Sequence, residues 1–393
     1  MNTKKIKLFF QGRKGLLPKI EAACASHQDI IWFHVASYGE FEEARPVIEA
    51  TRRRFPERKI LMTVFSPSVY EPMKDYPQVD WVFYLPLDTP WNARRFLDAV
   101  RPAKAIFNIG EHWPFLLHEL RRRGIETYIM SVRMEKDSPY RRWYGWMQRR
   151  ILQQCYRCVM VQNEESLRLL KELGVPEVRV VGDARVDRVV KVCRQQWSDP
   201  IVDCWCDGVK VFVAGSTYPA EDKMLLEVAN AHPETKMLII PHELDPSEVD
   251  AILAKAQNGA VRYTDYVGKK ADDRLLGAQI LVVDTVGMLS RLYRYGFAAF
   301  VGGGLTGPMP HSVIEPAAYG IPVAFGPRYD RELHCKDLAA LEAGFPVTNQ
   351  QELEFFYEKS LGDRAFLDRT GRAAAEYCRN SSGATDAIMK IIF

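Results

Sequence analysis

The 393-residue sequence lacks an apolar run of the roughly 18 residues that a membrane-spanning helix needs. It also lacks a secretory signal, because its basic start is not followed by a clean apolar segment and a cleavage site. No internal repeat or low-complexity segment is visible. With 47% hydrophobic and 26% charged residues and a net charge of +3, the composition is that of an ordinary soluble globular protein.

Cysteine is sparse, and no metal-binding pattern is present. There is no HExxH and no paired-aspartate sequence among the residues that could hold a cation. Cys155 and Cys158 form a CxxC, but no second pair follows at zinc-ligand spacing, since Cys204 and Cys206 stand too close together. We therefore predict reduced thiols, no disulfide framework and no metal site. The eight cysteines are Cys24, Cys155, Cys158, Cys193, Cys204, Cys206, Cys335 and Cys378.

Acidic residues are absent from the first twenty positions, which form a basic and apolar segment. Such a segment suits the surface of an anionic membrane. The alternative is an N-terminal arm that packs on its own domain, and the sequence does not choose between the two. The basic residues are Lys4, Lys5, Lys7, Arg13, Lys14 and Lys19, with Ile6, Leu8, Phe9, Phe10, Leu16 and Leu17 between them.

Short apolar runs alternate with helical patterns along the whole chain, which predicts parallel sheets covered by helices on both faces. The length exceeds what one core usually serves, so we expect two doubly wound domains facing a central cleft. Their predicted extents are 1–190 and 191–375, with a C-terminal helix over 376–393 that returns to the first domain. Expected strands are Ile30–Ala36, Ile60–Phe65, Trp81–Leu85, Ala105–Ile109, Thr127–Met130, Val159–Gln162, Val209–Ala214, Met237–Pro241, Ala260–Tyr263, Ile280–Asp284, Ala298–Gly302 and Pro322–Gly326.

The stretch Phe300–Val323 predicts a strand, a glycine-rich loop, a helix and a second strand. Without Cβ atoms, Gly302–Gly304 would let a ligand touch the backbone. The amides at the start of the next helix would then attract a phosphate, and Glu315 could accept hydrogen bonds from sugar hydroxyls. The alternative is that Ser312 and Glu315 form a capping box that satisfies the helix itself.

Other predicted strand ends carry candidate chemistry. Glu40 begins a helix after Gly39 and could act as a general base, or it could simply compensate the helix dipole. Ser216 and Thr217 could hold a phosphate or cap the next helix. Three further strands are also followed by candidate residues. These are His242, the turn Gly110–Pro114 with its E-H-W-P sequence, and Asp284–Leu289, whose backbone amides could read a nucleobase.

Taken together, these elements resemble the 3-deoxy-D-manno-octulosonic acid (Kdo) transferases of lipopolysaccharide and lipid A biosynthesis, a GT-B family. The resemblance runs from about Ile30 to Val347. Its motifs H-x-x-S-x-G-E, E-x-W-P, N-A-R, G-N-x-K-x-D, S-T-H-x-x-E, D-T-x-G-E-L and V-G-G-S…G-H-N-x-x-E-P-A correspond to His34–Glu40, Glu111–Pro114, Ser131–Arg133, Gly182–Asp187, Ser216–Glu221, Asp284–Leu289 and Val301–Ala317.

The resemblance implies an inverting glycosyltransferase that moves Kdo from CMP-Kdo to the lipid A precursor at the cytoplasmic face of the bacterial inner membrane. CMP-Kdo is a substrate, so neither a cofactor nor a nucleic-acid partner is implied. Glu40 would be the catalytic base. Ser37, Gly39, Glu111 and Arg133 would meet the acceptor, and Ser216, Thr217, His242, Gly287, Met288, Gly303, Gly304, His311, Ser312 and Glu315 would meet the donor.

Several positions depart from the family pattern, and they concern donor contacts. The usual histidine after Ser-Thr is Tyr218, the usual glutamate of G-E-L is Met288, and Pro310 precedes His311 where glycine is usual. Ile109 occupies the position where the family has the first glutamate of a double-glutamate element. The family's usual hydrophobic anchor is not seen, so we expect a trimmed or a peripheral protein. The alternatives are another GT-B transferase or epimerase, or a non-catalytic two-domain sugar- or nucleotide-binding protein.

Overall fold

The structure is a computed structural model that describes residues 3–109 and 112–393. The chain forms two compact units, which we call the first unit (residues 1–188 and 381–393) and the second unit (residues 189–380). The first unit ends at Arg188 and resumes at Ser381. The sequence predicted these boundaries after residues 190 and 375. In the described residues, no helix is long and apolar enough to span a bilayer.

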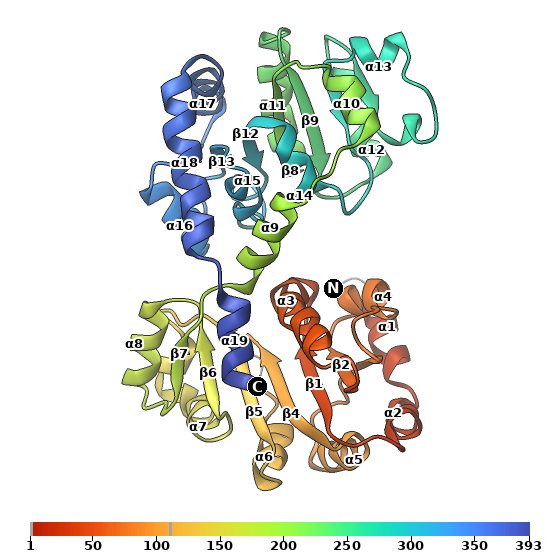
Figure 1. The fold of residues 1–393 in the computed structure, drawn as a ribbon, viewed down its shortest axis with the longest axis vertical. Coiled ribbons are helices and arrows are strands. Elements are labelled where there is room, and N and C mark those ends of the chain that lie inside the picture. The colour runs from red at the N-terminus through yellow and green to blue at the C-terminus, as the bar shows by residue number, and fades with distance from the viewer. Residues whose placement is uncertain (1–2, 110–111) are drawn as a thin grey trace. The chain divides into compact units, whose positions relative to one another are not determined.

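The first unit is built on a parallel sheet of seven described strands in the order β3-β2-β1-β4-β5-β6-β7 (Figure 1). Central strand β1 is buried along its whole length, as a strand covered on both faces must be. The strands are β1 (Ile30–Val35), β2 (Ile60–Val64), β3 (Trp81–Tyr84), β4 (Pro102–Asn108), β5 (Glu126–Val132), β6 (Cys158–Val161) and β7 (Val178–Val180).

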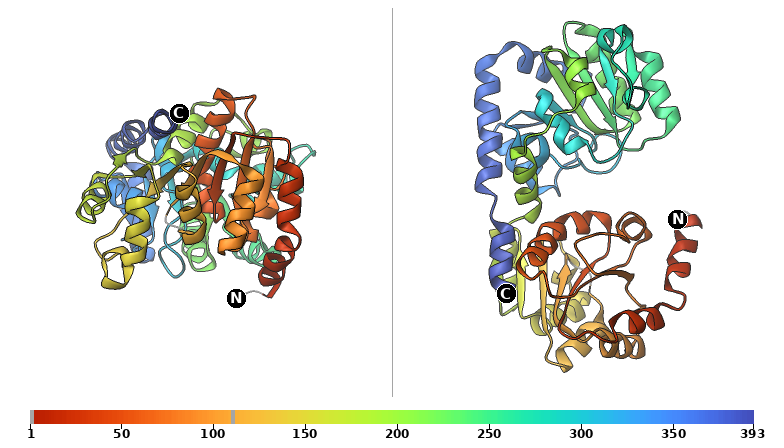
Figure 2. Two further views of the ribbon diagram at one scale, coloured as in Figure 1. Left: turned by 90° about the horizontal axis from the view of Figure 1, so that it is seen from below. Right: turned by 45° about the vertical axis from the view of Figure 1, so that its right-hand side comes forward.

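Helices cover both faces of this sheet (Figure 2). Several begin at the side-chain caps that the sequence supplies, such as Thr89 for α5 and Asn163 for α8. The helices are α1 (Thr3–Arg13), α2 (Leu16–Cys24), α3 (Tyr38–Arg54), α4 (Pro67–Met73), α5 (Pro90–Val100), α6 (Pro114–Arg122), α7 (Trp146–Gln154), α8 (Glu164–Glu172) and α19 (Ala384–Ile392), with 3-10 turns η1 (Pro139–Arg141) and η2 (Trp143–Gly145).

The N-terminal segment packs on its own unit, at least from Phe9 onward. The Arg13 guanidinium donates hydrogen bonds to the backbone oxygens of Leu85 and Phe65 and lies over the ring of Phe9. Leu16 and Leu17 are buried, whereas Phe10 is exposed. This is the alternative that the sequence left open, an arm folded against its own domain.

The second unit repeats the architecture with a parallel sheet in the order β10-β11-β9-β8-β12-β13-β14. Its core gathers around buried residues of the central strands, such as Phe212 and Phe300. The strands are β8 (Val211–Thr217), β9 (Lys236–Pro241), β10 (Ala260–Arg262), β11 (Ile280–Val282), β12 (Gly296–Val301), β13 (Val323–Phe325) and β14 (Gly344–Pro346).

Helices of the second unit also lie on both faces of its sheet. Helix α9 (Ala184–Arg194) contains the division between the units at Arg188. The others are α10 (Pro200–Cys206), α11 (Pro219–Ala231), α12 (Pro246–Lys255), α13 (Asp273–Gly277), α14 (Leu289–Leu292), α15 (Ile314–Ala318), α16 (Leu333–Ala340), α17 (Gln350–Gly362) and α18 (Arg364–Asn380), with 3-10 turns η3 (Thr264–Tyr266) and η4 (Tyr293–Tyr295).

Each sheet has a central point where the strand order changes direction. In the first unit this point lies between β1 and β4, and in the second between β8 and β12. Connections from neighbouring strands diverge there, so open α/β sheets bind ligands at the carboxyl ends of those strands. These two places therefore position a candidate site on each unit.

Candidate active site

Glu40 lies at the switch point of the first unit, where β1 passes into α3. Ser37 is the N-cap of α3, and its hydroxyl oxygen accepts a hydrogen bond from the Glu40 amide at 3.4 Å. In return, the amide of Ala36 donates to Glu40 Oε2 at 2.8 Å. Glu40 is only 9% exposed. The turn thus holds one carboxylate in a fixed orientation at the carboxyl end of the central strand.

Gly39 is exposed and occupies a helical position in α3. A Cβ added here would meet only the Ser37 hydroxyl, at 4.0 Å, and Gly39 is not among the glycines with positive φ. The backbone at this turn therefore does not require glycine, because any residue could adopt it. What the glycine does provide is open surface beside Glu40.

His34 connects the Glu40 turn to the neighbouring motif. Its Nδ1 lies 3.1 Å from the backbone oxygen of Thr63, which only accepts hydrogen bonds, so Nδ1 carries the proton. The indole of Trp113 then donates to His34 Nε2 at 3.1 Å. A buried histidine thus joins β1, β2 and the start of α6. Gly110 and Glu111, predicted at this turn, lie outside the described residues.

A buried polar network lies behind Glu40, and sequence reasoning missed its central residue, Glu43. The Asn108 amide, at the end of β4, donates to the Glu40 backbone oxygen at 3.0 Å and to Glu43 Oε2 at 3.1 Å. Burial is the main cause that raises the pKa of the Glu43 carboxyl, while Arg185 and Arg133 act in the opposite direction. The sequence did contain a signal for Glu43. It stands three residues after Glu40, and residues three apart share a helix face.

Two predicted residues of the first unit also act on this network. Arg133 follows β5, is exposed and lies near enough to Glu43 to lower its pKa. Arg185 binds Asp183 through its guanidinium and its own backbone amide, and lies 3.6 Å from Glu43 Oε1. The structure thus brings Arg133 near Glu43, which lies one turn beyond Glu40 on α3.

In the second unit, three aromatic side chains from three different strand ends stack at the switch point. We call Tyr218, His242 and His311 the Tyr218 cluster. The rings of His242 and His311 lie 4.3 Å apart, and the Tyr218 hydroxyl is 3.0 Å from His311 Nε2. Burial, with a further contribution from His242, lowers the pKa of His311 to about 4. The departure at Tyr218 therefore places a phenol, which is neutral at pH 7, against a neutral imidazole.

Glu221 ties the turn after β8 to the loop after β12. Its carboxylate accepts hydrogen bonds from the amide of Tyr218 at 3.0 Å and from the amide of Gly303 at 2.9 Å. Burial raises the pKa of Glu221 to about 7, although both amides act to lower it. Tyr218, and not Ser216 or Thr217, is the N-cap of α11, so the capping alternative for those two residues is wrong.

The glycine loop, residues 302–304, is packed against backbone. A Cβ on Gly302 would meet the Ser216 oxygen at 2.0 Å, and one on Gly303 would meet the Met309 oxygen at 2.4 Å. The Gly302 amide donates to Gly215, that of Gly303 to Glu221 and that of Gly304 to Pro308. These glycines permit close packing within the protein, whereas the sequence predicted that they leave room for a ligand. A phosphate at this turn would need other donors.

Glu315 lies in the first turn of α15, a helix of five residues. Val313 is the N-cap and makes no side-chain cap, so the predicted capping box of Ser312 and Glu315 does not form. Glu315 is half-buried and acts electrostatically on the buried phenol of Tyr293. The capping alternative is therefore excluded for Ser312.

The loop after β11 lies at the same edge of the second sheet. Asp284 accepts hydrogen bonds from the amide of Thr264 at 3.0 Å and from its hydroxyl at 2.6 Å. Gly287 has a φ of 88°, a conformation that favours glycine, and Met288 follows as the N-cap of α14. Ser216, with a φ of 56°, marks a second unusual turn at this edge.

Comparisons with known proteins bear on both units. Residues 10–188 match the family model of 3-deoxy-D-manno-octulosonic-acid transferase (Kdo transferase). The chain is 25% identical over 384 residues to the 3-deoxy-D-manno-octulosonic acid transferase of Haemophilus influenzae, covering 94% of this chain and 88% of that protein. It is 26% identical over 333 residues to that of Aquifex aeolicus, covering 82% and 83%.

The solved structures that it resembles show the fold. One is a UDP-GlcNAc 2-epimerase from Neisseria meningitidis, with a TM-score of 0.64 at 12% identity, covering 92% of this chain and 98% of that one. Another is a glycosyltransferase from Rickettsia africae, with a TM-score of 0.59 at 10% identity, covering 93% and 98%. The predicted GT-B fold is confirmed.

Proposed function

We propose that this chain is a glycosyltransferase of the Kdo transferase family and that it moves Kdo from CMP-Kdo to a sugar hydroxyl of the lipid A precursor. The observation that carries the proposal is the relationship to the Haemophilus protein over 94% of the chain. The matched length includes both the Glu40 turn, where we place the acceptor, and the Tyr218 cluster, where we place the donor.

On the acceptor side, Glu40 acts as the general base. Its carboxylate takes the proton of the acceptor hydroxyl while the hydroxyl oxygen bonds to the anomeric carbon of Kdo. The bond from that carbon to the phosphate oxygen breaks, CMP leaves with the electron pair, and the configuration inverts. The hydrogen bond from Ala36 fixes the carboxylate before the reaction, which reduces the cost of orienting it. Ser37, Gly39, Glu111 and Arg133 form the surrounding acceptor surface.

On the donor side, polar groups at the second switch point receive CMP. Ser216, Thr217 and the amides near Ser312 hold the phosphate, and Glu315 binds the ribose. Backbone at Gly287 and Met288 reads the cytosine, while His242, His311, Gly303 and Gly304 shape the pocket. Hydrogen-bond donors fixed before the reaction stabilise the charge that develops on the leaving phosphate.

We further propose that the enzyme works at the cytoplasmic face of the inner membrane. Trp143, Tyr144, Trp146 and Met147 are exposed around η2 and the start of α7, beside the exposed Arg142. Amphipathic aromatic rings with cations suit the interface of an anionic bilayer. The Arg149 guanidinium donates to the backbone of Tyr140 and Arg142, which holds this surface loop in place. The N-terminal segment packs on its own unit but leaves Lys7, Lys14 and Lys19 exposed, and these cations add to the attraction.

The test is incubation of the full chain with CMP-Kdo and tetraacylated lipid A precursor, followed by mass spectrometry of the lipid. We expect the lipid to gain the mass of one or more Kdo residues, and the mass reports how many. A parallel reaction with UDP-GlcNAc examines the alternative activities. Conversion of UDP-GlcNAc to its epimer, with no Kdo on the lipid, would replace the proposal by an epimerase.

A further inference from the structure

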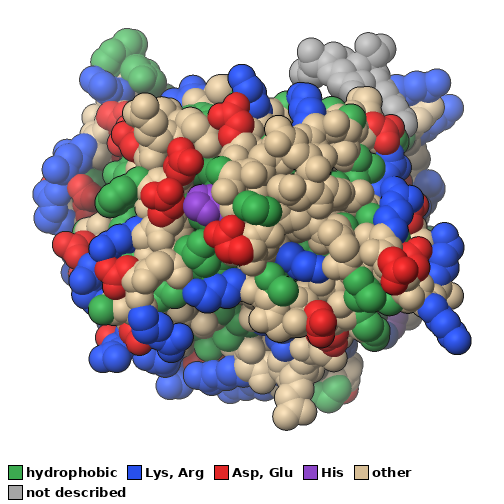
Figure 3. Space-filling model, turned by 90° about the horizontal axis from the view of Figure 1, so that it is seen from above, with side chains coloured by type: hydrophobic (Ala, Val, Ile, Leu, Met, Phe, Trp, Pro, Cys, Tyr) green, Lys and Arg blue, Asp and Glu red, His purple; other side chains and the backbone are tan. Residues whose placement is uncertain are grey.

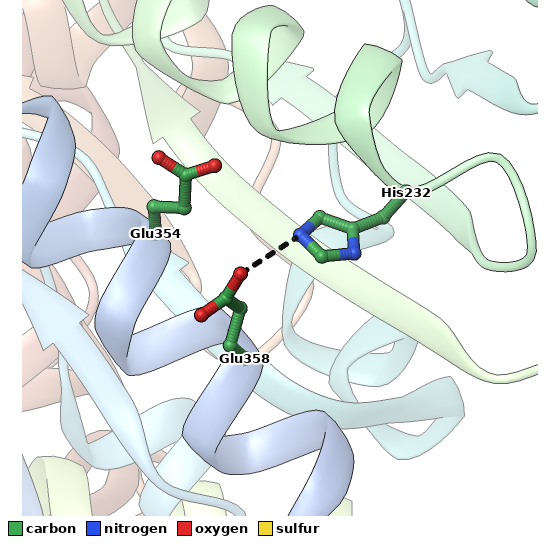
Figure 4. Close-up of side chains that lie close together, drawn as sticks. All are labelled: His232, Glu354 and Glu358. Carbon is green, nitrogen blue, oxygen red and sulfur yellow. Dashed lines mark ion pairs between the residues drawn. The ribbon is translucent and has the colours of Figure 1, made fainter.

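His232 meets two glutamates of a distant helix at a place away from both switch points. It caps the C-terminal end of α11, and Glu354 and Glu358 lie one turn apart on α17. One ligand-type atom of each residue lies within 4.8 Å of the other two. Figure 4 shows the imidazole nitrogen directed toward the two carboxylates. The sequence predicted no metal set, since these residues lie far apart in it.

The imidazole offers a nitrogen that accepts no hydrogen bond from the described residues. His232 Nδ1 lies 3.2 Å from Glu234 Oε1, so Nδ1 carries the proton and donates it to that carboxylate. Nε2 is then an acceptor with a lone pair. This atom is buried, and no described residue forms a hydrogen bond with it; Glu358 Oε1 lies 4.0 Å away.

The surroundings hold the imidazole in this orientation. The Gln279 side-chain amide donates to the His232 backbone oxygen at 2.8 Å, and so does the Thr235 hydroxyl at 3.0 Å. The ring lies 4.9 Å from that of Tyr357 on α17. A histidine whose second nitrogen donates to a carboxylate, with the first directed at further carboxylates, is the usual outer arrangement of a protein metal ligand.

From this juxtaposition we propose that His232 Nε2, Glu354 and Glu358 bind a divalent transition metal ion, with Zn²⁺ as its best representative. Imidazole with carboxylates suits zinc, whereas Mg²⁺ and Ca²⁺ select oxygen ligands. Ligand atoms around Zn²⁺ stand roughly 3.4 Å apart at bond lengths near 2.1 Å. The half-buried and exposed glutamate side chains need only a small movement to reach that spacing.

The site serves as a clip between elements. Helix α11 starts after β8 and ends just before β9, so His232 lies at the edge of the sheet opposite the Tyr218 cluster. A metal ion there ties α17 to the turn between α11 and β9. It stabilises the second unit by binding the folded state alone, and it takes no part in the transfer of Kdo.

The experiment measures Zn²⁺ binding and melting temperature for the full chain, stripped with EDTA and titrated with ZnCl₂ or MgCl₂. Zn²⁺ is expected to raise the melting temperature of the second unit by roughly 5 °C, and Mg²⁺ is expected to have no effect. The double variant Glu354→Gln/Glu358→Gln should lose about 100-fold in Zn²⁺ affinity. Glu234→Gln, which only orients the imidazole, should lose about tenfold. The control is Glu376→Gln on α18, which should bind as the wild type does.

Anomalous diffraction from zinc-soaked crystals locates the ion without any variant. A peak about 2 Å from His232 Nε2 supports the clip. Zinc found only at His242 and His311 or at the thiols would overturn it, as would an unchanged response in the double variant. Equal melting temperatures of wild type and double variant in EDTA show that the substitutions leave the fold intact. The outcome is independent of the transfer assay.

Discussion

Glycine at position 39 is not required by the fold but leaves space for the proposed acceptor. Its backbone is helical and a Cβ there meets nothing closer than 4.0 Å, so the fold does not require glycine at this position. The proposed acceptor, however, approaches Glu40 across this surface. A methyl group would therefore stand in its path without disturbing the protein.

Gly39→Ala is expected to leave the melting temperature unchanged or slightly higher and to lower the transfer rate roughly tenfold, the effect of a misplaced methyl group on binding. The measurements are a thermal melt and a transfer assay on the same preparation. Gly277→Ala serves as control, because that exposed glycine on α13 has no atom within 4 Å of an added Cβ. Full activity in Gly39→Ala would place the acceptor elsewhere.

Glu221 predicts a specific dependence of stability on pH. Its folded pKa is raised from 4.5 to about 7, so between those values the folded state binds more protons than the unfolded state. The contribution of Glu221 to stability is therefore present below about pH 4.5 and is lost as pH rises to 7. In Glu221→Gln the fall in melting temperature across this window should be smaller than in the wild type.

The matched control is Glu227→Gln, an exposed residue of the same helix, which should keep the wild-type profile. Melting temperatures at several pH values from 4.5 to 7.5 provide the comparison. Identical pH profiles for Glu221→Gln and Glu227→Gln would contradict the assignment.

The C-terminal helix α19 is capped at its N-terminal end by an aspartate from another helix. Asp187 on α9 accepts hydrogen bonds from the amides of Gly383 and Thr385, the latter at 2.6 Å. Ile388 and Ile392 of α19 are buried in the core of the first unit. Asp187 is the last residue of the Gly182–Asp187 motif, to which we assigned no role from the sequence. In the structure its carboxylate caps helix α19.

Asp187→Ala is expected to cost the first unit about 1–2 kcal/mol of unfolding free energy, the usual loss when a helix cap is removed. Urea denaturation followed by a probe of the first unit measures it. Asp75→Ala, which removes an exposed aspartate from the loop before β3, should cost nothing measurable. Equal midpoints for the two variants would show that α19 does not depend on this cap.

The central strands could be predicted from the sequence, because β1, β2, β8 and β9 are apolar runs followed by polar turns. Edge strands β7 and β14 were missed, since each has three residues and no apolar run: Val178–Val180 has two exposed residues, and Gly344–Pro346 ends in proline. The carboxyl-edge turns were also found. The role of each turn could not be predicted, because it depends on packing between distant segments. The glycine loop at residues 302–304 and the short helix α15 are two examples.

The site was predictable where a residue's neighbours lie close in sequence. Glu40 and Ser37 share one turn, so their placement followed from spacing. Glu43, in contrast, has a pKa that burial raises and that groups on β4 and α9 act to lower, and Glu221 reaches an amide 82 residues away. Such contacts exist only once the sheet has assembled.

At the scale of the whole molecule, two parallel sheets with separate cores account for the length and composition. On the face seen in Figure 3, acidic and basic side chains are mixed, in keeping with the net charge of +3. A field of one sign does not cover this face. For the membrane binding that we propose, the relevant surface is therefore the local cluster of exposed residues around η2, namely Trp143, Tyr144, Trp146 and Met147.

Trp143→Ala/Trp146→Ala should reduce binding to vesicles of phosphatidylglycerol by at least about tenfold, since the two exposed rings lose their place in the interface. Co-sedimentation at low and high salt measures it, and the basic neighbours should make wild-type binding weaken with salt. Trp91→Ala, an exposed tryptophan of α5, is the control. A loss of equal size in that variant would leave the loop without a special role.

The central claim is that Glu40 accepts the proton of the acceptor hydroxyl. The most direct measurement is the single-turnover rate of Kdo transfer by Glu40→Gln, together with CMP affinity by calorimetry. If Glu40 is the general base, we expect a rate at least about 10³-fold lower, with CMP affinity within about twofold of the wild type. Transfer within a few fold of the wild-type rate would contradict it.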